Sequence, residues 1–253
     1  MRRLFAVAAA AAVLAAACSS GGGGDASSGG APKGCETVQA DVSPEKVTLL
    51  TDLAQRFNSS SAATSGGCVF VKVQKLASGA GAQLLADGWS DPATSGPAPV
   101  IWSPAARSWG AVLNQRLAVK GQPAMAPADA RSFMVTPLVI AMPKPMAEAL
   151  GWPTTPIGWS DVLALARDPN GWASKGHPEW GAFKLGKTNP NFSTSGLSST
   201  IAQYYAATGK QSGLTIEDVA NPDVDTFMRG VESAVVHYGD TTLTFLNNLY
   251  RND

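Results

Sequence analysis

Six hydroxyl side chains lie close together at the predicted start of a helix, and their chemistry suits the binding of a small molecule. They are Ser193, Thr194, Ser195, Ser198, Ser199 and Thr200. Neutral hydroxyl groups donate and accept hydrogen bonds, so they hold a ligand without a permanent ion pair and allow its release. The free amides and positive dipole of a helix start also favour anions and carboxylates.

The turn before this helix belongs to the same candidate site. Asn189 and Pro190 turn the chain, and Gly196 lets the backbone approach a ligand closely. We therefore expect Asn189, Ser193, Thr194, Ser195 and Gly196 to bind the ligand. An equally good interpretation is that Ser193 or Thr194 only caps the helix.

Other candidate residues lie where a predicted strand meets a helix, which is where ligands bind in open α/β sheets. They are Ser43, Trp102, Ser103, Thr136 and Asp240. For Ser43 and Asp240, helix capping is the favoured interpretation. Trp102 could stack on a ligand, but a tryptophan at the end of a buried strand more often belongs to the core.

Residues suited to catalysis are few. The chain has two histidines, His177 and His237, and no G-x-S-x-G or H-E-x-x-H motif. Lys187 precedes the serines in a turn-rich stretch, which is the wrong order and spacing for a serine–lysine hydrolase. We therefore predict no catalytic residue, no metal site and no cofactor.

The elements that position these residues alternate between strand and helix. In the first half, strands are predicted over residues 35–43, 68–76 and 98–104, and helices over 43–58, 79–89 and 105–118. In the first helix, Ser43 is the expected N-cap, and Val47, Leu50 and Ala54 share one face. Such βα units favour a mostly parallel sheet covered by helices.

A second lobe is predicted to begin near Pro137. The apolar stretch from Phe133 to Met142 predicts a strand that crosses between lobes. Further helices are expected over 158–169 and 194–209, and a strand over 180–187. Residues 221–239 and 240–250 are predicted as two more helical segments.

The N-terminus has the layout of a secretory signal, with two arginines, an apolar run and small residues up to Cys18. Residues 14–18 resemble a bacterial lipobox, in which the cysteine is lipidated and anchors the protein to the membrane. The alternative is an ordinary signal peptide that is cut elsewhere. Residues 19–34 are rich in glycine and serine and predict a flexible tether.

Two cysteines remain once Cys18 is assigned to lipid. In an oxidising compartment we expect Cys35 and Cys68 to form a disulfide, the alternative being two buried free thiols. The formal net charge is zero, which indicates no electrostatic attraction to nucleic acid. We expect four regions: a signal peptide over 1–18, the tether over 19–34, and α/β lobes over 35–136 and 137–253.

Several motifs, in this order, resemble one protein family over most of the chain after the tether. They are the lipobox, "SPEK", "WSP", "TPLVIAMPKPMAEALGW", "FKLGKTNPNFSTSGL" and "VVHYGDTTLTFL". Together they resemble the bacterial extracellular solute-binding proteins of the periplasmic-binding class II fold. They are similar, more narrowly, to actinobacterial substrate-binding lipoproteins that often carry a von Willebrand factor A domain.

The resemblance implies two α/β lobes that are joined by a hinge and close on a small solute, with an ABC permease as a partner. It does not imply a particular ligand. In that fold the chain returns to the first lobe, so we expect this sequence to be a fragment of a longer protein. The alternative function is a surface adhesion or sensing protein that combines this fold with a von Willebrand factor A domain.

Overall fold

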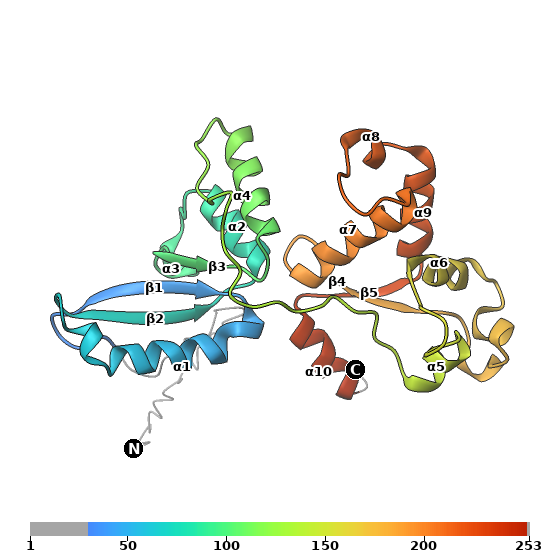
Figure 1. Ribbon diagram of the computed structural model, residues 1–253, viewed down its shortest axis with the longest axis horizontal. Helices are drawn as coiled ribbons and strands as arrows, with labels where there is room; N and C mark the ends of the chain where they lie inside the picture. The colour runs from blue at the N-terminus through green and yellow to red at the C-terminus, as the bar shows by residue number, and fades with distance from the viewer. Residues whose placement is uncertain (1–29, 252–253) are drawn as a thin grey trace, which may run out of the picture.

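A computed structural model describes residues 30–251, and it contains two parallel β-sheets with helices on both faces. The first sheet has the order β2-β1-β3, with β1 (Glu36–Val42), β2 (Val69–Lys75) and β3 (Ile101–Ser103). The second sheet pairs β4 (Leu185–Thr188) with β5 (Val235–Gly239). The two sheets lie in separate halves of the molecule (Figure 1). The chain therefore has the predicted two-lobed α/β fold.

The first lobe is built from βα units, as the alternating pattern predicts. Its helices are α1 (Val47–Asn58), α2 (Ser78–Ala86), α3 (Pro92–Ser95) and α4 (Ser108–Val119), with the short 3-10 helices η1 (Pro44–Lys46) and η2 (Ser61–Ala63). Alternate residues of β1 face opposite sides of the sheet. Ala40 and Val42 pack with Ala54 of α1, while Gln39 and Asp41 are buried on the other side.

A second cluster of buried side chains joins α2 to α4. Ala82 and Ala86 of α2 pack against Trp109, Leu113 and Leu117 of α4. Trp102 of β3 is partly buried and packs against this cluster, as the core interpretation expects, while its contact with a ligand stays a prediction. This packing fixes the start of α2 next to the end of β3.

A disulfide joins Cys35 to Cys68, as cysteine parity predicts. The two cysteines precede β1 and β2, which pair in parallel from Glu36 opposite Val69. The bond therefore links the beginnings of two adjacent strands, on either side of α1.

The predicted strand over residues 133–142 is wrong. These residues cross from the first lobe to the second as an extended segment that pairs with no strand of residues 30–251 (Figure 1). Their apolar side chains are largely exposed, and Val135 is 95% exposed. Apolar residues favour a strand only where a partner strand satisfies the backbone, and Pro137 also removes one donor. The predicted lobe boundary, between Thr136 and Pro137, falls within this segment.

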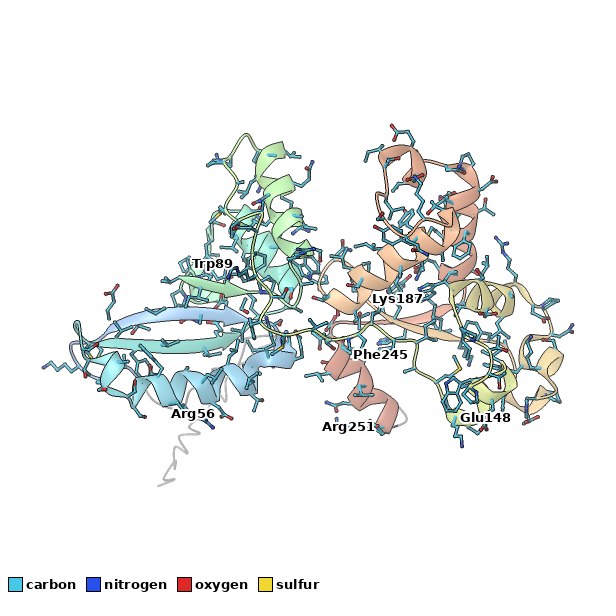
Figure 2. All side chains as sticks on the ribbon, in the orientation of Figure 1. Arg56, Trp89, Glu148, Lys187, Phe245 and Arg251 are labelled. Carbon is cyan, nitrogen blue, oxygen red and sulfur yellow. A yellow bond between two sulfur atoms is a disulfide. The ribbon has the colours of Figure 1, made fainter. Side chains whose placement is uncertain are left out.

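The second lobe contains the remaining helices. They are α5 (Lys144–Ala149), α6 (Trp159–Arg167), α7 (Thr194–Thr208), α8 (Ile216–Val219), α9 (Pro222–Glu232) and α10 (Thr242–Arg251), with η3 (Gly171–Lys175) and η4 (Pro178–Trp180). Helices α6, α7 and α9 lie above the second sheet and α10 lies below it (Figure 1). Phe245 lies on α10, below the second sheet (Figure 2). A Cβ atom added at Gly186 or Gly239 would lie 2.1 or 2.6 Å from its ring.

One strand of the second lobe differs from the sequence prediction. The sequence predicts a helix over residues 221–239, but the helix ends at Glu232 and Val235–Gly239 forms β5. Only Gly239 of this strand is buried, so its side chains show no clear alternation between buried and exposed positions. The pairing with β4 across the sheet, rather than the local pattern, makes this segment a strand.

No helix within residues 30–251 is long and apolar enough to span a membrane. Cys18 and the signal-like segment lie outside the residues that the structure describes.

Candidate functional site

Four of the five strands end next to residues that the sequence predicts as ligand contacts. β1 leads to Ser43, β3 ends at Ser103, β4 leads to Asn189 and β5 leads to Asp240. In Figure 1 the arrowheads of β1 and β2 point toward the second lobe, and the loop after β4 contacts α2. The strand ends of both lobes therefore converge on the region between them.

The hydroxyls of the second lobe form one hydrogen-bonded cluster around Ser195. The Ser195 Oγ atom lies 2.6 Å from Thr188 Oγ1, 3.2 Å from Ser193 Oγ and 2.8 Å from Thr242 Oγ1. These residues come from β4, from the start of α7 and from the start of α10. Ser193 and Thr188 are each 6% exposed. We name Thr188, Ser193, Ser195 and Thr242 the hydroxyl cluster.

Thr194 connects the two lobes. Its Oγ1 atom accepts a hydrogen bond of 2.8 Å from Trp109 Nε1 and lies 3.4 Å from Ser78 Oγ. The Ser78 hydroxyl also accepts from the amide of Ala105, two residues after β3. Leu197 packs against the apolar cluster around Trp109. The start of α7 is thus bound to the starts of α2 and α4.

The backbones of the two lobes also meet directly. The Gly79 amide donates to the Phe192 carbonyl at 3.0 Å. A Cβ atom at Gly79 would lie 2.0 Å from the Asn191 carbonyl oxygen, so only glycine fits this contact.

The first-lobe side of the region contains a buried cation that sequence reasoning missed. Lys46 is 5% exposed, and its Nζ atom donates to Ser103 Oγ and to the Pro104 carbonyl, each at 2.8 Å. Burial lowers the pKa of its ammonium group. The ring of Phe133 lies 5.2 Å from Nζ, within the range of a cation–π contact. Lys46 is in the "SPEK" motif, where its position in a helical turn gives no sign of this role.

Ser43 lies beside this lysine but does not cap the helix through its side chain. It is 1% exposed, and its hydroxyl donates to the Glu45 carboxylate at 2.5 Å rather than accepting a backbone amide. Its own amide donates to the Ser103 carbonyl at 3.1 Å, which extends the pairing of β1 with β3. Ser43, Ser103 and Lys46 therefore form one polar group at the ends of two strands.

Helix capping also fails to account for the serines of α7. Ser193 is the N-cap residue, but its side chain makes no capping hydrogen bond. Thr194, the alternative cap, is occupied by Trp109 and Ser78. At the start of α10, the Thr241 hydroxyl accepts from the Thr244 amide, so Thr241 fills the capping role expected of Asp240. Asp240 itself is exposed.

Two further predicted residues have different environments. Thr136 is exposed on the crossing segment and makes no side-chain hydrogen bond within residues 30–251. Gly196 is buried, and a Cβ atom there would lie 2.3 Å from the Thr188 carbonyl oxygen. Gly196 therefore allows α7 to approach the end of β4, rather than allowing the backbone to approach a ligand.

The arrangement offers neither a paired nucleophile and base nor a metal site among the described residues. Lys187 forms an ion pair with Glu232 of α9, and no serine within residues 30–251 contacts its ammonium group. No group of three or more His, Cys, Asp or Glu side chains in this part of the chain could hold a metal ion. What converges between the lobes is a set of hydroxyls and one ammonium group, which is chemistry for binding.

Comparison with known proteins agrees with this geometry. A profile of the family described as "Bacterial extracellular solute-binding protein" matches residues 39–253. Searches of curated proteins and of solved structures found no match. The chain belongs to this family of solute-binding proteins, whose members act outside the cytoplasm.

Proposed function

We propose that this bacterial extracellular solute-binding protein is anchored to the membrane through Cys18 and delivers a small polar or anionic solute to an ABC-type importer. The observation that carries the proposal is the convergence of strand ends on the region between the lobes. There the hydroxyl cluster lies next to Thr194, whose side chain contacts the first lobe. Open α/β sheets bind ligands at the carboxyl ends of their strands.

The ligand binds when the lobes separate and close again around it. In this proposal, the contacts of Thr194 with Trp109 and of Gly79 with Phe192 break when the lobes separate. In the bound state, the ligand exchanges hydrogen bonds with Ser193 and Ser195 on one side and with Ser43 and Ser103 on the other. Lys46 adds a positive charge on the first-lobe side, which favours an anion. No bond of the solute is broken.

A ligand screen tests this function. Native mass spectrometry of the protein purified from its own host would identify a retained solute. Thermal melting against sulfate, phosphate, small carboxylates and neutral polar compounds would then rank solutes by stabilisation. At a hundredfold excess over Kd, a ligand stabilises the protein by about 2.7 kcal/mol. If no solute raises the melting temperature, the proposed binding function is wrong.

Replacement of Cys18 tests the anchor separately. Because thioether-linked lipid would hold the protein at the membrane, we expect Cys18→Ser to move it from the membrane to the soluble fraction. Metabolic labelling with palmitate should disappear in the same variant. Replacement of Ser19 by alanine leaves the cysteine in place and serves as the control. Membrane retention and labelling that survive Cys18→Ser would contradict the anchor.

The alternative function is adhesion or sensing through a partner von Willebrand factor A domain. The exposed apolar side chains of the crossing segment, Phe133, Val135 and Val139, favour it because such a surface suits a protein contact. Genes for a permease and an ATPase next to this gene support transport. Their absence, together with a cell-binding defect on deletion, supports adhesion.

A further inference from the structure

The second lobe contains a cavity of about 580 Å³ between α7, α9 and the end of β4. Its lining includes Asn191, Tyr204 and Arg229, together with Asn189 and Thr200 from the stretch that the sequence singles out. Among the described residues it includes no member of the hydroxyl cluster and no residue of the first lobe. Its volume falls within the range of about 300–1,000 Å³ that is typical of small-molecule sites. We propose that this α7–α9 cavity is a second ligand site, and that it takes a neutral polyhydroxylated molecule of about the size of a monosaccharide.

The floor of the cavity is a hydrogen-bonded network in which Lys187 and Gln203 are buried, whereas Tyr238 is 46% exposed. Lys187 forms an ion pair with the Glu232 carboxylate, and its side chain is 4% exposed. The Tyr238 hydroxyl donates to the second oxygen of Glu232. Gln203 is fully buried; with its amide oriented to satisfy both neighbours, it donates to Glu232 Oε1 at 3.2 Å and accepts from Lys187 Nζ at 3.3 Å. Both charges on the floor therefore have a partner before a ligand arrives.

The phenol of Tyr238 keeps its proton in this network. Burial, together with the hydrogen bond to Glu232, raises the pKa of Tyr238 to about 12. The hydroxyl therefore remains a donor at neutral pH, and the carboxylate of Glu232 receives both a cation and a hydrogen bond.

The rim of the cavity is also neutral in sum. Arg229 Nε donates to Asp225 Oδ2 at 2.8 Å, one turn apart on α9. The charged groups of the lining thus form two pairs, Lys187 with Glu232 and Arg229 with Asp225. The charges of these two pairs cancel, so the lining has no net charge that would favour an anion or a cation over a neutral ligand.

Several neutral groups of the lining are left for a ligand. Within residues 30–251, the Asn191 side chain and the Tyr204 hydroxyl have no hydrogen-bond partner, and the Asn189 amide uses only its oxygen. An amide and a phenol match the hydroxyl groups of a polyol, which also donate and accept. The ring of Tyr204 and the side chain of Met228 supply an apolar wall for the C–H face of such a molecule.

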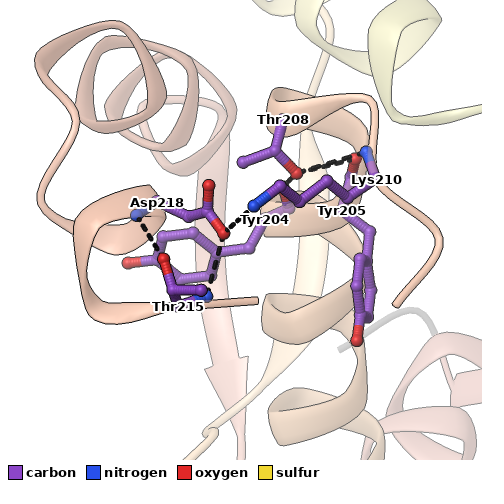
Figure 3. Close-up of polar contacts among 6 residues, drawn as sticks. All are labelled: Tyr204, Tyr205, Thr208, Lys210, Thr215 and Asp218. Carbon is purple, nitrogen blue, oxygen red and sulfur yellow. Dashed lines mark hydrogen bonds and ion pairs between the residues drawn. The ribbon is translucent and has the colours of Figure 1, made fainter. Parts of the chain in front are cut away.

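The position of Tyr204 is supported by the turn that follows α7. Figure 3 shows Tyr204 and Tyr205 leaving the helix in different directions. Lys210 forms an ion pair with Asp218, whose carboxylate also accepts from the Thr215 amide at 2.8 Å. This capping box at the start of α8 holds the chain next to the end of α7. Only Tyr204 of the two tyrosines lines the cavity, so Tyr205 provides a matched control.

The experiment measures the binding of glucose and myo-inositol to the full chain by saturation-transfer NMR and calorimetry, with gluconate and glucosamine as charged counterparts. We expect the neutral compounds to bind and the charged ones to bind more weakly. The double variant Asn191→Ala/Tyr204→Phe removes two of the free polar groups and keeps the ring, so affinity should fall about tenfold. Tyr205→Phe should leave it unchanged.

Two results would overturn the proposal. One is the absence of saturation transfer to every neutral compound, and the other is binding that the double variant does not weaken. The variant Ser193→Ala/Ser195→Ala separates this site from the proposed function. It should leave sugar binding intact, and a parallel loss would assign the sugar to the region between the lobes instead.

Discussion

At the scale of single residues, the buried polar groups of the first sheet influence stability more than they influence binding. Asp41 is fully buried, and one of its carboxylate oxygens has no hydrogen-bond partner within the described part of the chain. The other oxygen accepts from Gln39 Nε2 at 3.0 Å. Burial raises the pKa of Asp41, and the hydrogen bond from Gln39 opposes this only in part. An ionised Asp41 therefore destabilises the fold.

The sign of the effect follows from the direction of the pKa shift. The folded protein holds the Asp41 proton at higher pH than the unfolded chain does, so stability falls as pH rises from the unfolded pKa to the folded one. We expect Asp41→Asn to raise the melting temperature at pH 7, with a gain that shrinks on acidification toward about pH 4, near the unfolded pKa. Thermal melts at both values test this, with Asp52→Asn on the exposed face of α1 as the control. A gain that is constant with pH would contradict the burial argument.

At the scale of elements, the arrangement depends on the start of α2 fitting against the loop before α7. Gly79 is at this contact, where a Cβ atom would lie 2.0 Å from the Asn191 carbonyl oxygen. Alanine is a better helix former than glycine, so Gly79→Ala should not weaken α2 itself. The added methyl group acts on the contact between the lobes.

We expect Gly79→Ala to keep the lobes apart while each retains its fold. Overpacking of this kind typically costs about 1–3 kcal/mol. Small-angle X-ray scattering should show a larger radius of gyration, and circular dichroism should show unchanged helix content. Gly66→Ala is the matched control, because a Cβ atom there meets nothing within 4 Å. A radius equal to that of the parent protein would show that the contact does not hold the lobes together.

The sequence predicts correctly those helices and strands whose local residue pattern favours the same structure as their packing in the fold. The predicted boundaries of β1, α1 and α7 are close to the observed ones, because strand alternation or a helical face is visible in each. The predictions for β5 and the crossing segment are wrong because pairing between distant strands, which no local pattern reveals, decides both.

The same limit applies to the site. The density of hydroxyls at a helix start is enough to single out Ser193, Thr194 and Ser195. The roles of Lys46 and Ser78 escape prediction because they depend on Ser103 and Ala105, which are distant in the sequence. From the sequence alone, a lysine in a helical turn is expected at the surface, and only its neighbours in the fold show that it is buried.

At the scale of the whole molecule, two parallel sheets present their strand ends to one region between the lobes. The segment over residues 133–142 crosses beside this region, and Phe133 contacts Lys46 there. Thr194, Gly79 and Leu197 hold the lobes together in the described arrangement. Such an arrangement suits the binding of a solute, which is the role that its family membership supports.

The affinity of the Ser193→Ala/Ser195→Ala variant for the solute retained by the native protein tests the central claim most directly. This variant keeps Thr194, so the contact between the lobes remains, and Ser198→Ala on the same helix is the control. Loss of two hydrogen bonds, each worth about 0.5–1.5 kcal/mol, should weaken binding measured by calorimetry by about fivefold to a hundredfold. Unchanged affinity with a lower melting temperature would contradict the account, because it would assign these hydroxyls to holding α7 against β4 and α10.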